Sequence, residues 1–339
     1  MNNYLIIMKL RSLIYLLLAA VSLLAGHIAQ AEIADTEAVN RFIANMVSRH
    51  GFNETELKQQ FQGVEIQQSI LDAMAKPAEA KPWFQYREIF MTEARINGGV
   101  QFWRDNEAAL QAVQQQYGVP AEIIIAIIGV ESKYGANTGK YRVIDALATL
   151  GFAHPTRSEF FLKELESFLL LSRKDGIDPL LPTGSYAGAM GMPQFMPSSF
   201  QSYAVDFDHD GKRDIWKDPV DAIASVANYF VHNQWQTGAA VAYPVRAIGE
   251  SYRQALAKGV KPDTTVAKLR ALQIEAPQQL ANTETVKLLS FALTEGEELW
   301  LGLHNFYVIT RYNHSPLYAM AVYQLSQAIA ERKKTPLPS

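Results

Sequence analysis

The chain has 339 residues, of which 48% are hydrophobic, and this predicts a globular protein with room for more than one domain. Its 31 basic and 34 acidic residues give a formal charge of −3, so the chain lacks the positive field expected of a protein that binds nucleic acid. It contains no cysteine, which excludes disulfides, zinc–thiolate sites and a thiol nucleophile.

The N-terminus has the pattern of a secretory signal peptide. Lys9 and Arg11 precede an apolar run at residues 13–26, and Ala-Gln-Ala at residues 29–31 forms an A-x-A cleavage site. The alternative is a membrane anchor, but the run is shorter than the ~20 residues that a span needs. We therefore expect residues 1–31 to be removed after Ala31 on export to the periplasm. Without a cysteine to carry lipid, we expect no lipid anchor.

The helical pattern predicts a mainly α fold (α+β) with a buried central helix. A helix is predicted at residues 120–134, because Pro120 suits its first turn and Gly135 suits its end. This segment is apolar almost all round, which is typical of a helix at the centre of a core. Other helices are predicted at 159–173, at 221–235, and from Pro316, with Ser315 as the cap.

Composition along the chain suggests where domains begin and end. Residues 241–294 mix β-prone pieces with short helices, prolines and glycines, as in an insertion. The expected division after the signal peptide is an N-terminal α domain at 32–116, a core at 117–237, a small α/β insertion at 238–298 and the remaining part of the core at 299–335.

A carboxylate closes the apolar central helix. On a helix, Glu131 shares a face with Ile127 and Ile128. Desolvation and the negative end of the helix dipole should both raise its pKa, and a carboxyl protonated near neutral pH suits a general acid. The alternative is a core glutamate paired with Lys133, Arg142 or another base, and position alone does not decide between the two.

Four motifs occur in a fixed order along the chain: ESKYG at 131–135, GF at 151–152, YAGAMGMPQFMPS at 186–198 and RYN at 311–313. Together they resemble the membrane-bound lytic murein transglycosylase B family, over about residues 35–332. The resemblance implies a soluble, non-lipidated member with a lysozyme-like catalytic core, an N-terminal α domain and a small β-containing insertion. It also implies that peptidoglycan glycan strands are the substrate.

The resemblance further implies that Glu131 is the single catalytic acid and base. Glycosidases generally use two carboxylates, and these motifs offer only one. A lytic transglycosylase needs no second one. Its glutamate protonates the oxygen between N-acetylmuramic acid and N-acetylglucosamine, then takes the proton from the muramyl 6-hydroxyl as that hydroxyl closes on C1. The tethered nucleophile has an entropic advantage, and no cofactor is required for the chemistry.

Substrate-binding residues carry over by motif. Ser185 and Gln194 flank the glycine-rich loop and are expected to hydrogen-bond beside Glu131 and the sugar amides; the alternative is a turn serine and a capping glutamine. Further groove positions are expected at Tyr86, Arg157, Tyr229, Tyr312, Asn313 and Tyr318. The alternative for the tyrosines is that they fill the core.

An acidic loop at residues 206–218 has EF-hand-like spacing, with glycine at position 6. Its expected ligands are Asp206, Asp208, Asp210, the carbonyl of Lys212, Asp214 and Asp218. Position 12, where a glutamate belongs, is Lys217, and Asp218 follows one residue late. We expect a weak structural calcium or sodium site with no part in the chemistry; the alternative is a solvated acidic turn.

Two other functions remain open from the sequence. A hydrolytic muramidase would cleave the same bond with water and would need a second acid, such as Asp145, facing Glu131. A non-catalytic wall-binding protein would use Glu131 only structurally. A zinc peptidase or serine hydrolase is not expected, because H-E-x-x-H and G-x-S-x-G motifs are absent. Cell-wall synthesis enzymes are candidate protein partners.

Overall fold

The computed structural model describes residues 36–75 and 81–335, so the predicted signal peptide at 1–31 lies outside the described residues. Helices dominate these ranges, and the named strands form one short pair and one four-stranded sheet. Within the described ranges, no helix combines the length and the apolar character needed to cross a membrane. The prediction of a mainly α fold with a small β-containing part is confirmed.

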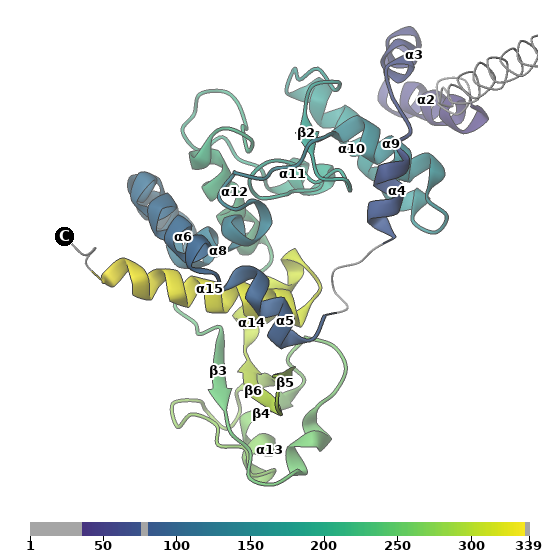
Figure 1. The fold of residues 1–339 in the computed structure, drawn as a ribbon. Helices are drawn as coiled ribbons and strands as arrows, with labels where there is room; N and C mark the ends of the chain where they lie inside the picture. The colour runs from purple at the N-terminus through teal and green to yellow at the C-terminus, as the bar shows by residue number, and fades with distance from the viewer. Residues whose placement is uncertain (1–35, 76–80, 336–339) are drawn as a thin grey trace, which may run out of the picture.

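One hydrophobic core joins the first helices to helices much later in the chain. It is built by α2 (Glu37–His50), α3 (Glu54–Gln62), α4 (Gln68–Met74), α9 (Val143–Ala153), α10 (Ser158–Lys174) and α11 (Pro197–Tyr203). On α10, Phe161, Leu165 and Phe168 recur at helical spacing and are at most 1% exposed. Figure 1 shows α2, α3, α4, α9 and α10 together at the upper right.

A second core surrounds α8 (Ala121–Ser132), the predicted central helix. Its other helices are α5 (Trp83–Phe90), α6 (Glu93–Asp105), α7 (Glu107–Tyr117), α12 (Pro219–His232), α14 (His304–Tyr312) and α15 (Pro316–Lys334). Residues 123–128 are each at most 2% exposed, because α6, α12 and α15 all pack against α8. Burying each isoleucine contributes about 1.5–3 kcal/mol, so α8 is fixed firmly in place.

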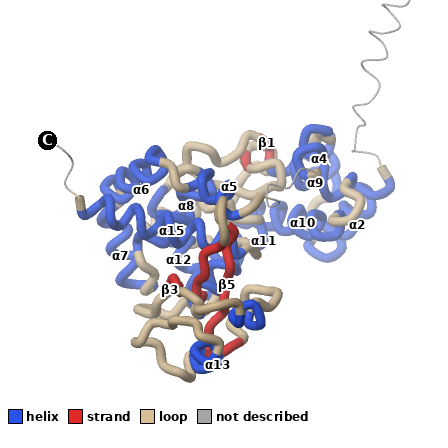
Figure 2. The backbone as a smooth tube through the Cα atoms, turned by 60° about the horizontal axis from the view of Figure 1, so that its bottom comes forward, coloured by secondary structure: helices blue, strands red, loops and turns tan. Residues whose placement is uncertain are grey.

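The four-stranded sheet lies beside the helical cores, as Figures 1 and 2 show from two directions. Its strands are β3 (Ala242–Val245), β4 (Thr264–Thr265), β5 (Thr285–Ala292) and β6 (Glu297–Gly302). They pair antiparallel in the order β3-β6-β5-β4, with Leu289 opposite Trp300. With α13 (Val266–Ala271) and the 3₁₀ helix Ser251–Ala255, the sheet encloses a small core of its own.

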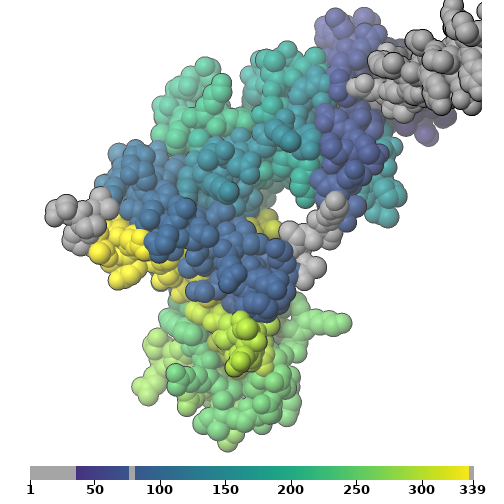
Figure 3. All heavy atoms as spheres, viewed as in Figure 1, coloured from purple at the N-terminus to yellow at the C-terminus, as the bar shows by residue number. Residues whose placement is uncertain are grey.

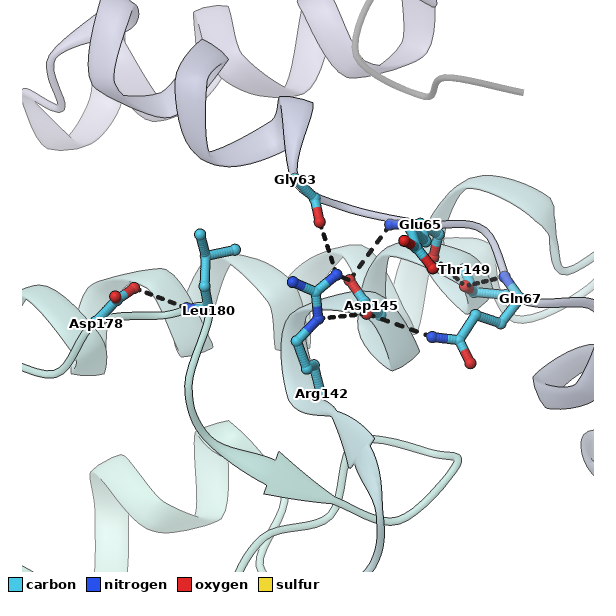
Figure 4. Close-up of polar contacts among 8 residues, drawn as sticks. All are labelled: Gly63, Glu65, Gln67, Arg142, Asp145, Thr149, Asp178 and Leu180. Carbon is cyan, nitrogen blue, oxygen red and sulfur yellow. Dashed lines mark hydrogen bonds and ion pairs between the residues drawn. The ribbon is translucent and has the colours of Figure 1, made fainter. Parts of the chain in front are cut away.

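An ion pair between Arg142 and the buried Asp145 fixes the segment between α3 and α4 to the start of α9 (Figure 4). Asp145 is 1% exposed and accepts hydrogen bonds from Arg142 Nε at 2.7 Å and Nη2 at 2.9 Å. It also accepts from the Glu65 backbone N–H and from Gln67 Nε2, while Arg142 donates to the Gly63 carbonyl. Both carboxylate oxygens of Asp145 are therefore used in this joint.

Residues 32–116, predicted as one N-terminal α domain, contribute to both helical cores. The helices α2 to α4 belong with α9 and α10, whereas α5 to α7 belong with α8. Figure 3 shows the purple surface of α2 to α4 apart from the blue surface of α5 to α7. A short antiparallel pair is formed by β1 (Tyr141–Arg142), which precedes α9, and β2 (Thr183–Gly184), which follows α10 in the sequence. The domain boundaries stay a prediction.

Candidate active site

Glu131 lies in the last turn of α8, where the helix stops abruptly. The helix ends at Ser132, and the next three residues all have positive φ angles: 52° at Lys133, 60° at Tyr134 and 85° at Gly135. A left-handed conformation costs about 1–3 kcal/mol for a residue with a side chain, so surrounding contacts must hold this turn. The helix ends two residues earlier than the pattern predicts, because the left-handed turn begins before Gly135.

Buried hydrogen bonds supply part of that support. Ser132 is fully buried, and its hydroxyl donates to the Ile128 carbonyl at 3.2 Å and accepts from the Gly135 backbone N–H at 3.0 Å. The Tyr134 N–H donates to the same Ile128 carbonyl at 3.3 Å. The carbonyls left unpaired at the end of α8 are thus partly satisfied, and the position of Glu131 is defined.

The carboxyl group of Glu131 has a hydroxyl partner and no cationic one. Its Oε1 accepts a hydrogen bond of 2.6 Å from the Tyr318 hydroxyl. No ion pair to Glu131 forms among the described residues, and Arg142, one suggested partner, binds Asp145 instead. Burial raises the pKa of Glu131 to about 7, and the Tyr318 hydrogen bond opposes this rise. The expected rise in pKa is therefore found, with desolvation as its cause.

A group of tyrosines supports this carboxyl from three helices. The ring of Tyr318, on α15, stacks on that of Tyr312 with centroids 6.4 Å apart, and Tyr312 contacts Tyr229, on α12, at 4.7 Å. The hydroxyl of Tyr312 donates to the Pro193 carbonyl at 2.6 Å, and that of Tyr229 donates to the Arg311 carbonyl at 2.5 Å. The structure therefore brings three of the predicted tyrosines together near Glu131.

Burial, and next the nearby Glu131 charge, raise the pKa values of Tyr312 and Tyr318 well above the usual range. Tyr318 consequently keeps its proton and remains a hydrogen-bond donor to Glu131 throughout the neutral range.

Ser185 and Gln194 shape the glycine-rich loop and form no hydrogen bond with Glu131 within the described residues. The Ser185 hydroxyl accepts from the backbone N–H groups of Ala187 and Ala189, as a turn serine does. Gln194 has a φ of 51°, and its Nε2 donates to the carbonyls of Thr138 and Gly191. Gln194 therefore ties this loop to the chain that follows the ESKYG motif.

The other residues predicted to line the groove differ in how they relate to Glu131. Tyr86, on α5, is 6% exposed and is one of the groups that raise the pKa of Tyr318, after burial and Glu131. Asn313 directly follows α14, next to Tyr312. Arg157 is exposed at the start of α10, and its guanidinium stacks over the rings of Phe160 and Phe161. Among the described residues, Arg157 forms no hydrogen bond or ion pair with Glu131.

The acidic loop brings carboxylates together in two overlapping groups. Asp206, Asp208 and Asp210 form one, and Asp208, Asp218 and Asp221 form the other, with ligand oxygens within 4.8 Å of one another in each group. Asp221 is not among the ligands expected from the sequence, because its place in the first turn of α12 is typical of an acid that favours a helix N-terminus. It is 1% exposed and accepts from the backbone N–H groups of Phe207 and Asp214.

Two predicted ligands have other roles in this loop. Asp214 accepts from the backbone N–H groups of Trp216 and Lys217, and Asp218 accepts from that of Val220. The backbone N–H of Lys212 donates to Asp210. The cluster of carboxylate oxygens fits a hard cation that prefers oxygen ligands.

Comparisons with known proteins place these features in a family. The model of the family described as "Transglycosylase SLT domain" matches residues 34–327. The membrane-bound lytic murein transglycosylase B of Escherichia coli (strain K12) is 45% identical over 309 residues, which cover 88% of this chain and 84% of that protein.

Two solved structures are similar along most of their length. Soluble lytic transglycosylase SltB1 from Pseudomonas aeruginosa is 51% identical, with a TM-score of 0.84 over 88% of this chain and 99% of that chain. The E. coli lytic transglycosylase SLT35, in complex with calcium, is 44% identical, with a TM-score of 0.82 over 89% of this chain and 95% of that chain.

Fold and site together define a mainly helical enzyme of the lysozyme-like class. The chain belongs to the membrane-bound lytic murein transglycosylase B family, which confirms the resemblance carried by its four motifs.

The Tyr318→Phe substitution should raise the pKa of Glu131 further. The lost hydrogen bond favours the ionised carboxylate, so its removal should move the pKa upward by about one unit. We would follow the titration by NMR with ¹³C-labelled glutamate. The matched control is Tyr323→Phe, which loses a hydroxyl bond to the Ala242 carbonyl. An unchanged or lower pKa in Tyr318→Phe would contradict this assignment.

The Glu131→Gln substitution should change how stability depends on pH. Because the folded pKa of about 7 exceeds the usual glutamate pKa of 4.5, the native state binds more protons than the unfolded state between these values. The wild type should therefore lose about 3 kcal/mol of stability from this group as pH rises through that window. Urea unfolding should show Glu131→Gln gaining stability relative to wild type from pH 4 to pH 8. A difference that stays constant with pH would exclude the raised pKa.

Proposed function

We propose that this enzyme is a periplasmic lytic transglycosylase that cleaves the MurNAc-β-1,4-GlcNAc bond of peptidoglycan and leaves 1,6-anhydromuramoyl ends. The observation that carries the proposal is one partly buried carboxyl, Glu131, which accepts a hydrogen bond from the Tyr318 hydroxyl and whose pKa of about 7 lets it act both as acid and as base near neutral pH. Murein is the substrate named for the E. coli relative, and the predicted signal peptide supports the location.

In the first step, protonated Glu131 gives its proton to the glycosidic oxygen, and the bond from that oxygen to muramyl C1 breaks. In the second step, the Glu131 carboxylate takes the proton of the muramyl 6-hydroxyl, whose oxygen bonds to C1. The glutamate is protonated again, and water is neither consumed nor released. The Tyr318 hydroxyl donates to Oε1 at 2.6 Å and stabilises the carboxylate formed between these steps.

Asp145, the second acid suggested for a hydrolytic muramidase, does not support that alternative. Asp145 would have to activate water, but its two oxygens are bound by Arg142, the Glu65 N–H and Gln67. An intramolecular hydroxyl needs no such base, because it is already held near C1. We propose that Tyr86, Arg157, Ser185, Gln194, Tyr229, Tyr312, Asn313 and Tyr318 line or shape the substrate groove.

The Glu131→Gln substitution should abolish product formation, because an amide can neither give nor take the required proton. We would digest isolated peptidoglycan sacculi and identify the released fragments by mass spectrometry. Wild type should release muropeptides with 1,6-anhydromuramoyl ends, and the folded variant should release none. Substantial activity in the variant would remove Glu131 from the mechanism. Reducing ends from the wild type would show hydrolysis.

We also propose that the acidic loop holds a structural calcium ion, with Asp206, Asp208 and Asp210 among the ligands. The support is the grouping of their oxygens and the calcium complex of SLT35. The ion would neutralise clustered carboxylates and order the loop before α12, without taking part in the proton transfers.

Calcium should raise the thermal midpoint of the wild type, and a chelator should reverse the rise. At calcium 100-fold above its Kd, binding to the native state adds about 2.7 kcal/mol of stability. Asp208→Asn, which affects both carboxylate groups, should weaken the response, whereas the exposed Asp72→Asn outside the loop should keep it. A wild-type midpoint insensitive to calcium would refute the site.

A further inference from the structure

A buried arginine on α6 has no carboxylate partner. Arg95 is 9% exposed, and no ion pair to it forms among the described residues. Arginine is seldom buried without a paired acid, because removing its charge from water is costly. Burial correspondingly lowers the pKa of Arg95. The function described so far does not use this group.

The partners of Arg95 belong to the end of the helix that carries Glu131. Its Nη1 donates to the Gly129 carbonyl, which also accepts from the Lys133 backbone N–H at 3.2 Å. The guanidinium lies 5.2 Å from the ring centroid of Phe90. Carbonyls in a last helical turn carry partial negative charge, so the end of α8 and an aromatic face together take the place of a carboxylate.

Tyr134 links the same two helices from the other direction. Its hydroxyl donates to the Arg95 backbone carbonyl at 2.7 Å. A Cβ added at Gly98 would lie 2.9 Å from the Tyr134 ring, one at Gly99 2.8 Å from its hydroxyl oxygen, and one at Gly129 2.6 Å from that oxygen. Three glycines therefore leave the slot between α6 and α8 that this ring fills. Tyr134 is one of the left-handed residues that follow Glu131.

We propose that Arg95 is a positioning residue for Glu131, and that with Tyr134 it holds the last turn of α8 in the geometry that keeps the carboxyl hydrogen-bonded to Tyr318. The inference rests on the proposed role of Glu131. Arg95 is bonded to a carbonyl two residues before Glu131, and Tyr134 follows three residues after it. The two contacts thus hold the chain to α6 on both sides of Glu131 in the sequence, whereas Tyr318 contacts its carboxyl from α15.

A structural role and a positioning role predict different results for Arg95→Met. An unpaired buried cation is not expected to add stability, so an apolar side chain of similar length should leave the protein at least as stable. The loosened turn should admit water to Glu131 and lower its pKa towards 4.5, the opposite direction to Tyr318→Phe. The base limb of the pH–rate profile should move to lower pH, and kcat should fall about tenfold or more with KM nearly unchanged.

The experiment measures urea unfolding, kcat, KM and the ¹³C titration of Glu131 in wild type, Arg95→Met and Arg95→Lys. Arg95→Lys keeps a cationic donor and should recover part of the lost kcat and pKa. The matched control is Lys287→Met, which removes a cation that is 1% exposed but paired with Asp263 in the sheet region. That variant should lose stability and keep the wild-type kcat and Glu131 titration.

A wild-type kcat and Glu131 pKa in Arg95→Met would overturn the proposal, and so would a loss of kcat that lysine does not restore. If Arg95→Met does not fold, Tyr134→Phe, which keeps the ring but loses the bond to Arg95, carries the same test on kcat and pKa. The Glu131 titration needs no turnover, so it reports on positioning even if wild-type products show that the proposed function is wrong.

Discussion

The site depends on a partly buried carboxyl group that has no cationic partner among the described residues. Glu131 lies in the last turn of a helix in which residues 123–128 are at most 2% exposed, and among the described residues its Oε1 accepts one hydrogen bond, from the Tyr318 hydroxyl. An arginine or lysine beside the Glu131 carboxyl would favour its ionised form and lower the pKa of Glu131. Desolvation raises the pKa to about 7 against the opposing Tyr318 hydrogen bond, and the acid and base forms are then both populated near neutral pH.

The rest of the fold maintains this condition. The apolar face of α8 is covered by α6, α12 and α15, and the tyrosines of α12, α14 and α15 form a stacked group beside the carboxyl. The buried Asp145 is paired with Arg142, so it is not a second unpaired acid. Raising the pKa of a buried group costs stability above its usual pKa, which is the trade-off expected at a functional site.

Much of this architecture could be predicted from local sequence patterns. The apolar run before Glu131 predicts α8, Ser315 and Pro316 predict the start of α15, and the D-x-D-x-D-G spacing predicts the acidic loop. These predictions succeed because helical periodicity, capping and turn preferences act within a few residues. The position of Glu131 on the isoleucine face likewise predicts the raised pKa.

The remaining features depend on contacts between distant segments. Arg95 is 34 residues from Gly129 and Tyr318 is 187 residues from Glu131, and no local pattern encodes either pairing. The two halves of residues 32–116 join different cores for the same reason, since the choice is made by α9, α10 and α8. Ser185 shows the converse case: its local turn preference determines its observed hydrogen bonds.

The most direct test of a single glutamate working without water is cleavage of peptidoglycan in H₂¹⁸O, followed by mass spectrometry of the new chain ends. The proposed mechanism predicts anhydro ends without ¹⁸O, because the oxygen that closes on C1 comes from the sugar itself. One ¹⁸O atom at C1 of each new end would show that water is the nucleophile, and would contradict the proposal.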